Sequence, residues 1–243
     1  MKADLHIHTS YSYDSTASPK KMVDAALRMG INCLAITDHN EVKGSLEAAE
    51  YAKEKPILII PGIEIKSREG DILGLNIKRI IPSGLSAKET IEKIKEEGGL
   101  AIIPHPFGWI CSFKGDLMNL LKEIDGIEVL NASIFGPGNK IALDFAQKFN
   151  LPFTAGSDAH SPNFIGKCYL EIPGDNLSVE EAIASSLASA KVSAIEEVLE
   201  KLKKREAKIG GGETGFFEKL LDHAKRNIAK VQNYACGKQK KIQ

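Results

Sequence analysis

Histidine and carboxylate residues recur in five short motifs within the first two thirds of this 243-residue chain. The motifs are Asp4-Leu5-His6-Ile7-His8-Thr9, Thr37-Asp38-His39, Gly62-Ile63-Glu64, His105-Pro106 and Gly156-Ser157-Asp158-Ala159-His160. Asp14 follows the first motif and Asp71 follows the third. If these ionisable groups share one pocket, they need a counter-charge, and imidazole with carboxylate is a donor set that suits zinc, manganese or iron. The residue types therefore predict a metal-binding pocket.

Each motif lies in or at the end of a predicted strand. His6 and His8 are two residues apart on a strand expected at 3–7, so both side chains leave the same face of that strand. The other motifs belong to strands expected at 33–37, 57–65, 100–103 and 153–155, and Asp71 opens a strand at 71–77. Because the carboxyl ends of parallel strands meet on one face of an α/β fold, these side chains are expected to converge there.

The wider pattern alternates strands with helices. Helices are expected between Ser18 and Gly30, over 41–53, after a capping box of Ser86 and Glu89, near 116–122, over 139–149 and over 178–190. With a further strand at 127–130, roughly seven strands alternate with these helices, which is typical of β-α units with a parallel sheet. Several strands are apolar throughout, so both of their faces should be covered. A barrel and a doubly wound sheet both fit this pattern.

Composition excludes several classes of protein. Apolar residues make up 43% of the chain, enough to build a core, so a mainly disordered protein is excluded. Lys and Arg number 32 and so do Asp and Glu, which argues against a general nucleic-acid coat. The most apolar stretch, at 56–65, is much shorter than the ~20 residues of a membrane span. We therefore expect a cytoplasmic protein that does not bind membranes.

The neutral balance hides a difference between two parts of the chain. Residues 1–190 carry 19 basic and 25 acidic residues, whereas residues 191–243 carry 13 basic and 7 acidic ones. The second part also shows apolar residues at helical spacing. We predict a catalytic domain over 1–190 and a basic amphipathic helical tail over 191–243, which is a candidate for contact with nucleic acid or a protein partner.

The five motifs resemble those of the PHP (polymerase and histidinol phosphatase) family, in the same order along the chain. The motifs span residues 4–160, and the resemblance covers about residues 1–190. It implies a distorted seven-stranded β/α barrel, TIM-like, with a C-terminal helical extension. It also implies hydrolysis of phosphoesters at a cluster of two or three divalent ions, with manganese, zinc or iron as candidates.

The resemblance further implies a role for each motif residue. One ion would be held by His6, His8, Glu64 and Asp158; a second by Glu64 as a bridge and His105; and a third by Asp14, His39 and His160. Asp71 stands where relatives with three ions often have histidine. It is either a ligand, favouring a harder ion such as manganese, or a sign that the second site is weak. Asp38 is either a direct ligand or a partner that orients an imidazole.

Other residues are weaker candidates for the chemistry. Asp158 or Asp38 is a candidate to orient or deprotonate the attacking water, and Arg68 and Lys167 are candidates for phosphate contacts. For both basic residues, a solvated surface charge is the competing interpretation. Asn131 is a candidate for lining the pocket. The remaining residues are expected to be structural: Glu128 in the body of a strand, and Phe107, Trp109 and Phe113 in core packing rather than in stacking on a base.

Two main hypotheses of function follow. The first is a phosphoesterase that uses a metal-activated hydroxide on a small phosphomonoester, a nucleotide or an oligonucleotide. The second is a PHP-type nuclease or an accessory module of a nucleic-acid-processing assembly that uses the basic tail. A third hypothesis, metal-dependent amide hydrolysis, is less favoured because no motif for a carboxylated lysine ligand is recognisable.

Overall fold

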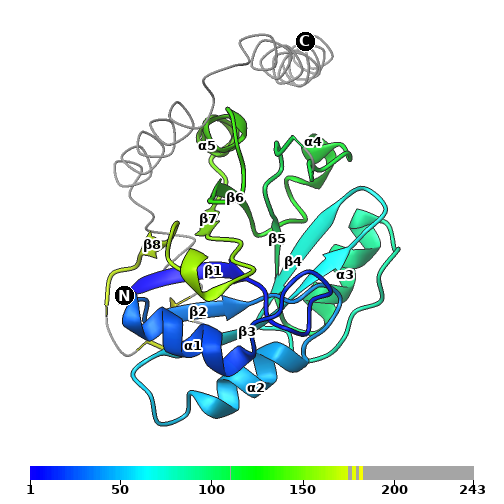
Figure 1. The fold of residues 1–243 in the computed structure, drawn as a ribbon. Coiled ribbons are helices and arrows are strands. Elements are labelled where there is room, and N and C mark those ends of the chain that lie inside the picture. The colour runs from blue at the N-terminus through cyan, green and yellow to red at the C-terminus, as the bar shows by residue number, and fades with distance from the viewer. Residues whose placement is uncertain (110, 175–176, 179–180, 183–243) are drawn as a thin grey trace, which may run out of the picture.

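The computed structural model describes residues 1–109, 111–174, 177–178 and 181–182. The tail predicted at 191–243, and the helix predicted up to residue 190 beyond its first turn, lie outside the described residues. Within the described part, an eight-stranded sheet curls into a nearly closed barrel with helices on its outside (Figure 1). The expected distorted β/α barrel is therefore confirmed, with one more strand than expected.

The strands follow the order β7-β6-β5-β4-β3-β2-β1-β8 around the sheet. Their bounds are β1 (Lys2–Ile7), β2 (Cys33–Ile36), β3 (Leu58–Lys66), β4 (Asp71–Leu75), β5 (Leu100–Ile103), β6 (Gly126–Asn131), β7 (Phe153–Gly156) and β8 (Leu170–Glu171). The additional strand, β8, has only two residues and pairs antiparallel to β1. Such a short strand carries no periodic signal in a sequence.

Backbone contacts after β7 bring the two ends of the sheet together. The amide of Asp158 donates to the His6 carbonyl at 2.8 Å, and the amide of His8 donates to the Ala159 carbonyl at 2.9 Å. Ile7 and Ala159 form a parallel bridge. The first and the last motif, which lie about 150 residues apart in the sequence, are therefore held side by side by the backbone.

One part of the sheet departs from the expected parallel arrangement. β4 is antiparallel to both β3 and β5. The connection from β3 to β4 is only residues 67–70, with the Ser67 amide bonded to the Gly70 carbonyl at 2.9 Å. This is too short for a crossover helix, so the two strands form a hairpin. As a result Asp71, the first residue of β4, lies beside the carboxyl end of β3.

Helices begin close to where the sequence predicts them. Their bounds are α1 (Pro19–Arg28), α2 (Lys43–Tyr51), α3 (Ala87–Glu96), α4 (Leu117–Leu120) and α5 (Gly138–Phe149), with a short 3₁₀ turn, η1 (Pro162–Phe164). The capping box of Ser86 and Glu89 is present at the start of α3. The Glu181 amide also donates to the Ser178 hydroxyl at 3.2 Å, the cap expected there. No described helix has the length and apolar character needed to cross a membrane.

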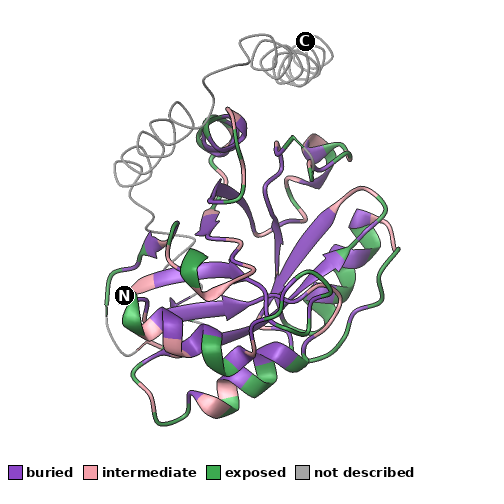
Figure 2. Cartoon of the chain, viewed as in Figure 1, coloured by how far each residue is buried: buried purple, intermediate pink, exposed green. Residues whose placement is uncertain are grey.

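The sheet supplies most of the core. Nearly every strand residue is buried, while the outer faces of the helices are exposed (Figure 2). Isoleucine and leucine side chains from the strands pack with those of α3 and α5 in one cluster, and α1 and α2 cover the other face of β1 and β2 in a second cluster. The polar side chains buried in the structure are therefore exceptions that need partners.

Candidate metal centre

The predicted ligands come together at the carboxyl edge of the barrel. They form three overlapping groups whose ligand atoms lie within 4.8 Å of one another: His6, His8 and Asp158; His6, Glu64 and His105; and His8, Asp14, His39 and His160. We call the side chains of His6, His8, Glu64, His105 and Asp158 the inner group, and those of Asp14, His39 and His160 the outer group. Asp71 is in none of the three clusters.

Four donor atoms of the inner group converge on one point. His6 Nε2 lies 3.2 Å from His8 Nε2, and these nitrogens lie 3.3 and 3.2 Å from Glu64 Oε2 and 3.5 and 3.2 Å from Asp158 Oδ1. In a tetrahedral zinc site with bonds of about 2.0–2.1 Å, neighbouring ligand atoms are roughly 3.3 Å apart. The spacing and chemistry of these four atoms therefore fit a divalent ion.

The two oxygens of Glu64 face different imidazoles of the centre. Oε2 belongs to the four-atom set and also lies 3.2 Å from His39 Nδ1, whereas Oε1 lies 3.3 Å from His105 Nε2. A carboxylate with its oxygens turned toward different imidazoles has the arrangement needed to bridge two ions. The bridging role implied by the family resemblance is therefore geometrically feasible.

The outer group is built around Asp14. Its Oδ2 lies 3.3 Å from His39 Nε2 and 3.1 Å from His160 Nε2. The side chains of Asp14 and His160 are each 33% exposed and that of His39 is 15% exposed, whereas His6 and His8 are fully buried. The outer group thus lies between the buried ligands and solvent.

Hydrogen bonds fix the orientation of four imidazoles. Nδ1 of His6 lies 3.1 Å from Glu128 Oε1, and Nδ1 of His105 and His160 lie 3.0 and 2.9 Å from the carbonyls of Cys111 and Asp158. Because these oxygens accept, each Nδ1 carries the proton, and the lone pair of each Nε2 faces the cluster.

The fourth imidazole, His8, is oriented through Ser12. Its Nδ1 lies 3.0 Å from the Ser12 hydroxyl, which donates its one hydrogen to Asp38 Oδ1 at 3.0 Å. The hydroxyl therefore accepts from Nδ1, and Nε2 of His8 presents its lone pair to the cluster. Asp38 also accepts from the Thr9 amide and hydroxyl at 2.6 and 2.7 Å. The structure thus places the Asp38 carboxylate behind His8, linked to it through Ser12, and outside the three ligand groups.

Burial and charge act against each other in the inner group. Burial disfavours the charged form of His6, but Asp158, Glu128 and Glu64 outweigh it and hold its pKa well above the usual value. The same balance raises the pKa of His8 to about 9. For Glu64 and Asp158, burial is outweighed by the histidines, so the pKa of each carboxyl is lowered. The carboxylates thus attract positive charge, which a divalent ion supplies when it displaces these protons.

The backbone at two of these residues is unusual. His105 and Asp158 have positive φ values of 31° and 51°, a region that residues other than glycine rarely adopt. Gly156 precedes Asp158, and a Cβ atom there would lie 2.4 Å from Cβ of His6. The local strain and the close approach serve to direct these side chains into the cluster.

Two other buried carboxylates support the centre from behind. Glu128, expected to be merely structural, holds His6 through Oε1, while its Oε2 accepts from the His105 amide at 3.0 Å and from Asn131 Nδ2 at 2.9 Å. Asp4 accepts from the Ser157 and Gly166 amides at 2.8 and 2.9 Å, and burial raises its pKa to about 6. Glu128 thus links His6 of the first motif to His105 of the fourth, and Asp4 links the first motif to Ser157 of the last.

The expected pocket residue Asn131 does reach the centre. Its Nδ2 lies 3.3 Å from Asp158 Oδ2 and bonds Glu128 as well. Asn139, at the start of α5, bonds both the amide and the carbonyl of Asn131. This pairing fixes the position of Asn131 between the two carboxylates.

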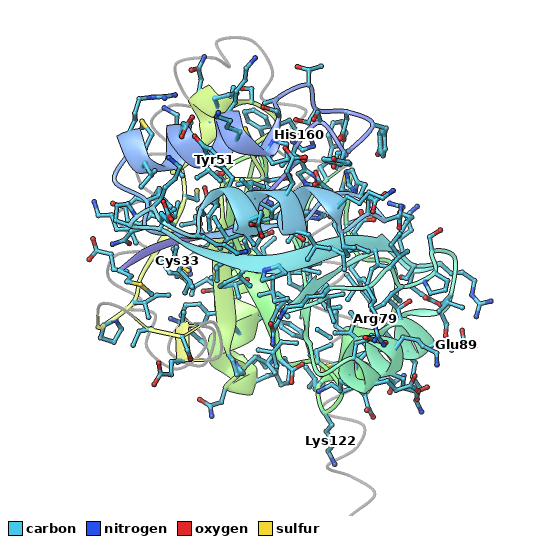
Figure 3. The ribbon with its side chains drawn as sticks, turned by 90° about the horizontal axis from the view of Figure 1, so that it is seen from below. Cys33, Tyr51, Arg79, Glu89, Lys122 and His160 are labelled. Carbon is cyan, nitrogen blue, oxygen red and sulfur yellow. The ribbon has the colours of Figure 1, made fainter. Side chains whose placement is uncertain are left out.

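The remaining predicted residues lie at the periphery. Arg68 is exposed and its guanidinium bonds Glu89 at 3.2 Å; Figure 3 shows Glu89 at the outer rim of the molecule, well away from His160. Lys167 is exposed, after η1. Of the three aromatic residues expected in the core, Phe113 is buried, Phe107 packs against the core, and Trp109 is 56% exposed.

Comparison with known proteins agrees with this geometry. The model of the PHP domain family matches residues 4–144, and the model of a PHP-associated region matches residues 136–207. This chain belongs to the PHP domain family. The PHP domain match alone covers more than half of the chain and includes every motif but the last.

Individual relatives extend this PHP assignment. An uncharacterised protein of Methanocaldococcus jannaschii is 47% identical over 155 residues, 59% of this chain and 90% of that protein. A 5′-3′ exoribonuclease of Haemophilus influenzae is 35% identical over 105 residues, 42% of this chain and 38% of the exoribonuclease. The exoribonuclease is thus a hydrolase that is similar to part of this chain.

Among solved structures, a two-domain protein of Bacteroides vulgatus that contains a predicted PHP-like metal-dependent phosphoesterase has a similar fold. The TM-score is 0.58 at 24% identity, and the match covers 67% of this chain. This chain spans about half of that protein, 53% of its length. The likeness supports the PHP barrel as the fold.

Proposed function

We propose that this protein is a metal-dependent phosphoesterase that acts on a nucleotide, an oligonucleotide end or another small phosphomonoester. The observation that carries the proposal is the convergence of His6, His8, Glu64 and Asp158 at the spacing of a metal coordination shell. Buried imidazoles with their lone pairs directed inward serve no evident packing purpose. Their donor set suits zinc, manganese or iron.

The ligand assignment follows the three groups. His6, His8, Glu64 and Asp158 would hold one ion, Glu64 and His105 a second, and Asp14, His39 and His160 a third. Bound divalent ions lower the pKa of water and neutralise the charge of phosphoryl oxygens.

Chain residues then orient the reactants. Asp158 is the candidate for orienting and deprotonating the attacking water, because its side chain is 13% exposed and therefore reached by solvent, unlike His6 and His8. Asn131 holds Asp158 Oδ2 in place. Asp38 serves as a positioning residue for His8 rather than as a group that touches the reacting atoms.

The surface around the centre favours a substrate with a planar ring. Among the described residues, the exposed large aromatic side chains all lie on segments that follow the carboxyl ends of β1, β5, β6 and β7. They are Tyr11, Tyr13, Trp109, Phe135 and Phe164. Tyr13 is 86% exposed and stacks on His39 with ring centroids 5.0 Å apart. Aromatic side chains of this kind stack on nucleobases irrespective of sequence, which favours a nucleotide over an aliphatic phosphoester.

The test combines metal analysis with a substrate panel. The purified protein should contain divalent metal and hydrolyse phosphorylated nucleotides in preference to aliphatic phosphoesters, and EDTA should abolish turnover until Mn²⁺ or Zn²⁺ is restored. His223→Ala, which removes the one histidine outside the motifs, should behave as wild type. Metal-independent turnover, or no turnover of any phosphoester with the centre loaded, would contradict the proposal.

A second candidate function, action on nucleic acid within an assembly, is favoured by the charge of residues 191–243. Their 13 basic residues against 7 acidic ones include the run Lys203-Lys204-Arg205. If these residues contact nucleic acid, single-stranded DNA should bind with an affinity that falls steeply with salt. Replacing the three basic residues by glutamine should weaken that binding and reduce its salt dependence. If the variant binds single-stranded DNA as the wild-type chain does, this role is rejected and the enzyme acting on a small substrate is favoured.

A further inference from the structure

A lysine that sequence reasoning did not select lies at the edge of the metal centre. Lys66 is the last residue of β3, two positions after Glu64. Residues two apart on a strand leave the same face, so Lys66 is on the face that carries Glu64 into the cluster. The offset along the strand is about 7 Å, toward the carboxyl edge. Lys66 therefore lies beyond Glu64 toward solvent: its side chain is 61% exposed, whereas that of Glu64 is 2% exposed.

Asp71 holds this lysine in place. The two residues are directly opposite each other in the β3–β4 hairpin. Lys66 Nζ lies 3.0 Å from both Asp71 oxygens and makes a hydrogen bond to Oδ2. Asp71 is only 6% exposed, whereas the side chain of Lys66 is 61% exposed. A buried carboxylate thus fixes an ammonium group that remains open to solvent.

The charge state of the pair agrees with this arrangement. Lys66 and Asp71 carry opposite formal charges, and the Lys66 ammonium lies 3.0 Å from the buried carboxylate. An ammonium has three N–H donors, so two remain after the hydrogen bond to Asp71 Oδ2. Because this cation is already held in place, it loses little additional conformational freedom when it binds an anion.

We propose that Lys66 forms an anion subsite that binds a phosphoryl oxygen of the substrate, and that Asp71 is the residue that positions it. The inference rests on the proposed phosphoesterase function. It assigns Asp71 a role other than metal ligation, in agreement with its absence from the three ligand groups. It also replaces Arg68, which is engaged by Glu89 at the rim, as the candidate phosphate contact.

The experiment compares Lys66→Met, Lys66→Arg and Asp71→Asn with the wild-type chain. Lys78→Met is the matched control, because Lys78 is an exposed lysine beyond the opposite end of β4. Four quantities are measured for each protein: the Kd of inorganic phosphate by titration calorimetry, KM and kcat for a phosphomonoester, and metal content by elemental analysis.

Lys66→Met should raise the Kd of phosphate and the KM roughly 10- to 100-fold, the effect expected of one hydrogen bond between charged groups. Its metal content should match wild type. Lys66→Arg should retain part of the affinity because it keeps the charge, Asp71→Asn should show a smaller loss, and Lys78→Met should show none.

Two results would overturn the inference. One is a Lys66→Met protein with wild-type metal content and an unchanged Kd for phosphate. The other is an Asp71→Asn protein that loses metal while Lys66→Met binds phosphate normally, which would make Asp71 a ligand and Lys66 only its counter-ion. If instead the wild-type protein hydrolyses no phosphomonoester, the proposed function fails, yet the phosphate titration still decides whether the anion subsite exists.

Discussion

The inner and outer groups of the candidate centre differ in how firmly the fold holds them. Each inner histidine has its outward nitrogen occupied: His6 by Glu128, His8 by Ser12 and His105 by a backbone carbonyl. In the outer group, His160 Nδ1 is also held by a backbone carbonyl, but Asp14 is one-third exposed and His39 turns both ring nitrogens toward carboxylates of the cluster. The difference indicates a prebuilt inner site and a more adaptable outer one.

This contrast has a consequence for metal binding. Ligands that are already oriented lose little freedom when an ion binds. Replacing a residue that orients a metal ligand typically lowers the affinity for the metal about 10- to 100-fold. We therefore expect the inner ion or ions to be retained and the outer ion to exchange more readily. The outer group is also the more exposed to solvent, and its His39 stacks against the exposed Tyr13.

The largest effect is expected from His8→Ala, because His8 belongs to the inner group and its ligand nitrogen also lies within 4.8 Å of the ligand atoms of Asp14, His39 and His160. Loss of a direct ligand should reduce the metal content of both groups together and lower kcat/KM by more than about 100-fold, beyond the effect of losing an orienting residue. Elemental analysis and steady-state kinetics measure the two. Normal turnover at full metal occupancy would show that His8 is not a ligand and that the two groups are not joined through it.

Glu128→Gln tests the inner group alone. The amide keeps the shape of the side chain but no longer presents a carboxylate to His6 Nδ1, so inner-site affinity should fall about 10- to 100-fold. Competition with a chromophoric chelator measures this loss, and the more readily released outer ion should be unaffected. Equal loss of affinity for the inner and the outer ions would contradict the distinction between the inner and outer groups.

Asp14→Asn tests the outer group. Because Asp14 contacts His39 and His160 but not the four-atom inner set, this change should release the weaker ion and leave the inner content unchanged. A fall in kcat/KM of about tenfold is expected, corresponding to the loss of one charge-assisted contact of an exposed group. Loss of all metal would mean that the inner site depends on the outer one.

The smallest effect is expected from Ser12→Ala. It removes one neutral acceptor behind His8 while the ligand itself remains, so inner-site affinity should fall by about two- to tenfold. Thr9→Ser, which keeps a hydroxyl for Asp38, is the matched control and should change little. A loss as large as that in His8→Ala would mean that the Asp38–Ser12 pair shapes the loop rather than one imidazole.

The convergence of the histidine and carboxylate side chains could be predicted from the sequence because residue type and strand position carry the information. His6 and His8 lie two apart on one strand, and the other motifs lie on strands whose carboxyl ends share an edge. The α/β class could be predicted because strands and helices alternate visibly, whereas the barrel was implied only by the resemblance to the PHP family. The sequence left Asp38 as a direct ligand, a partner that orients an imidazole or a group that acts on the water; in the structure its carboxylate accepts from Ser12, whose hydroxyl contacts His8.

The supporting residues could not be predicted, for physical reasons. All six residues of β6 are buried, so alternation does not reveal which face of the strand carries Glu128, and a register shift follows that residue. The contact between Lys66 and Asp71 depends on the antiparallel register of β3 and β4, which a pattern of apolar residues does not specify. Ser12 acts through the shape of a loop.

Metal stoichiometry under graded chelation separates the inner and outer groups in a single measurement. The wild-type protein, loaded with Mn²⁺ or Zn²⁺ and then desalted, is titrated with a chelator while bound metal and phosphoesterase activity are followed together. We predict at least two ions per chain that leave in two phases, the first phase absent from Asp14→Asn and the second phase shifted to weaker affinity in Glu128→Gln. Less than one ion per chain with every metal offered would contradict the account, as would activity that persists after the last ion has left.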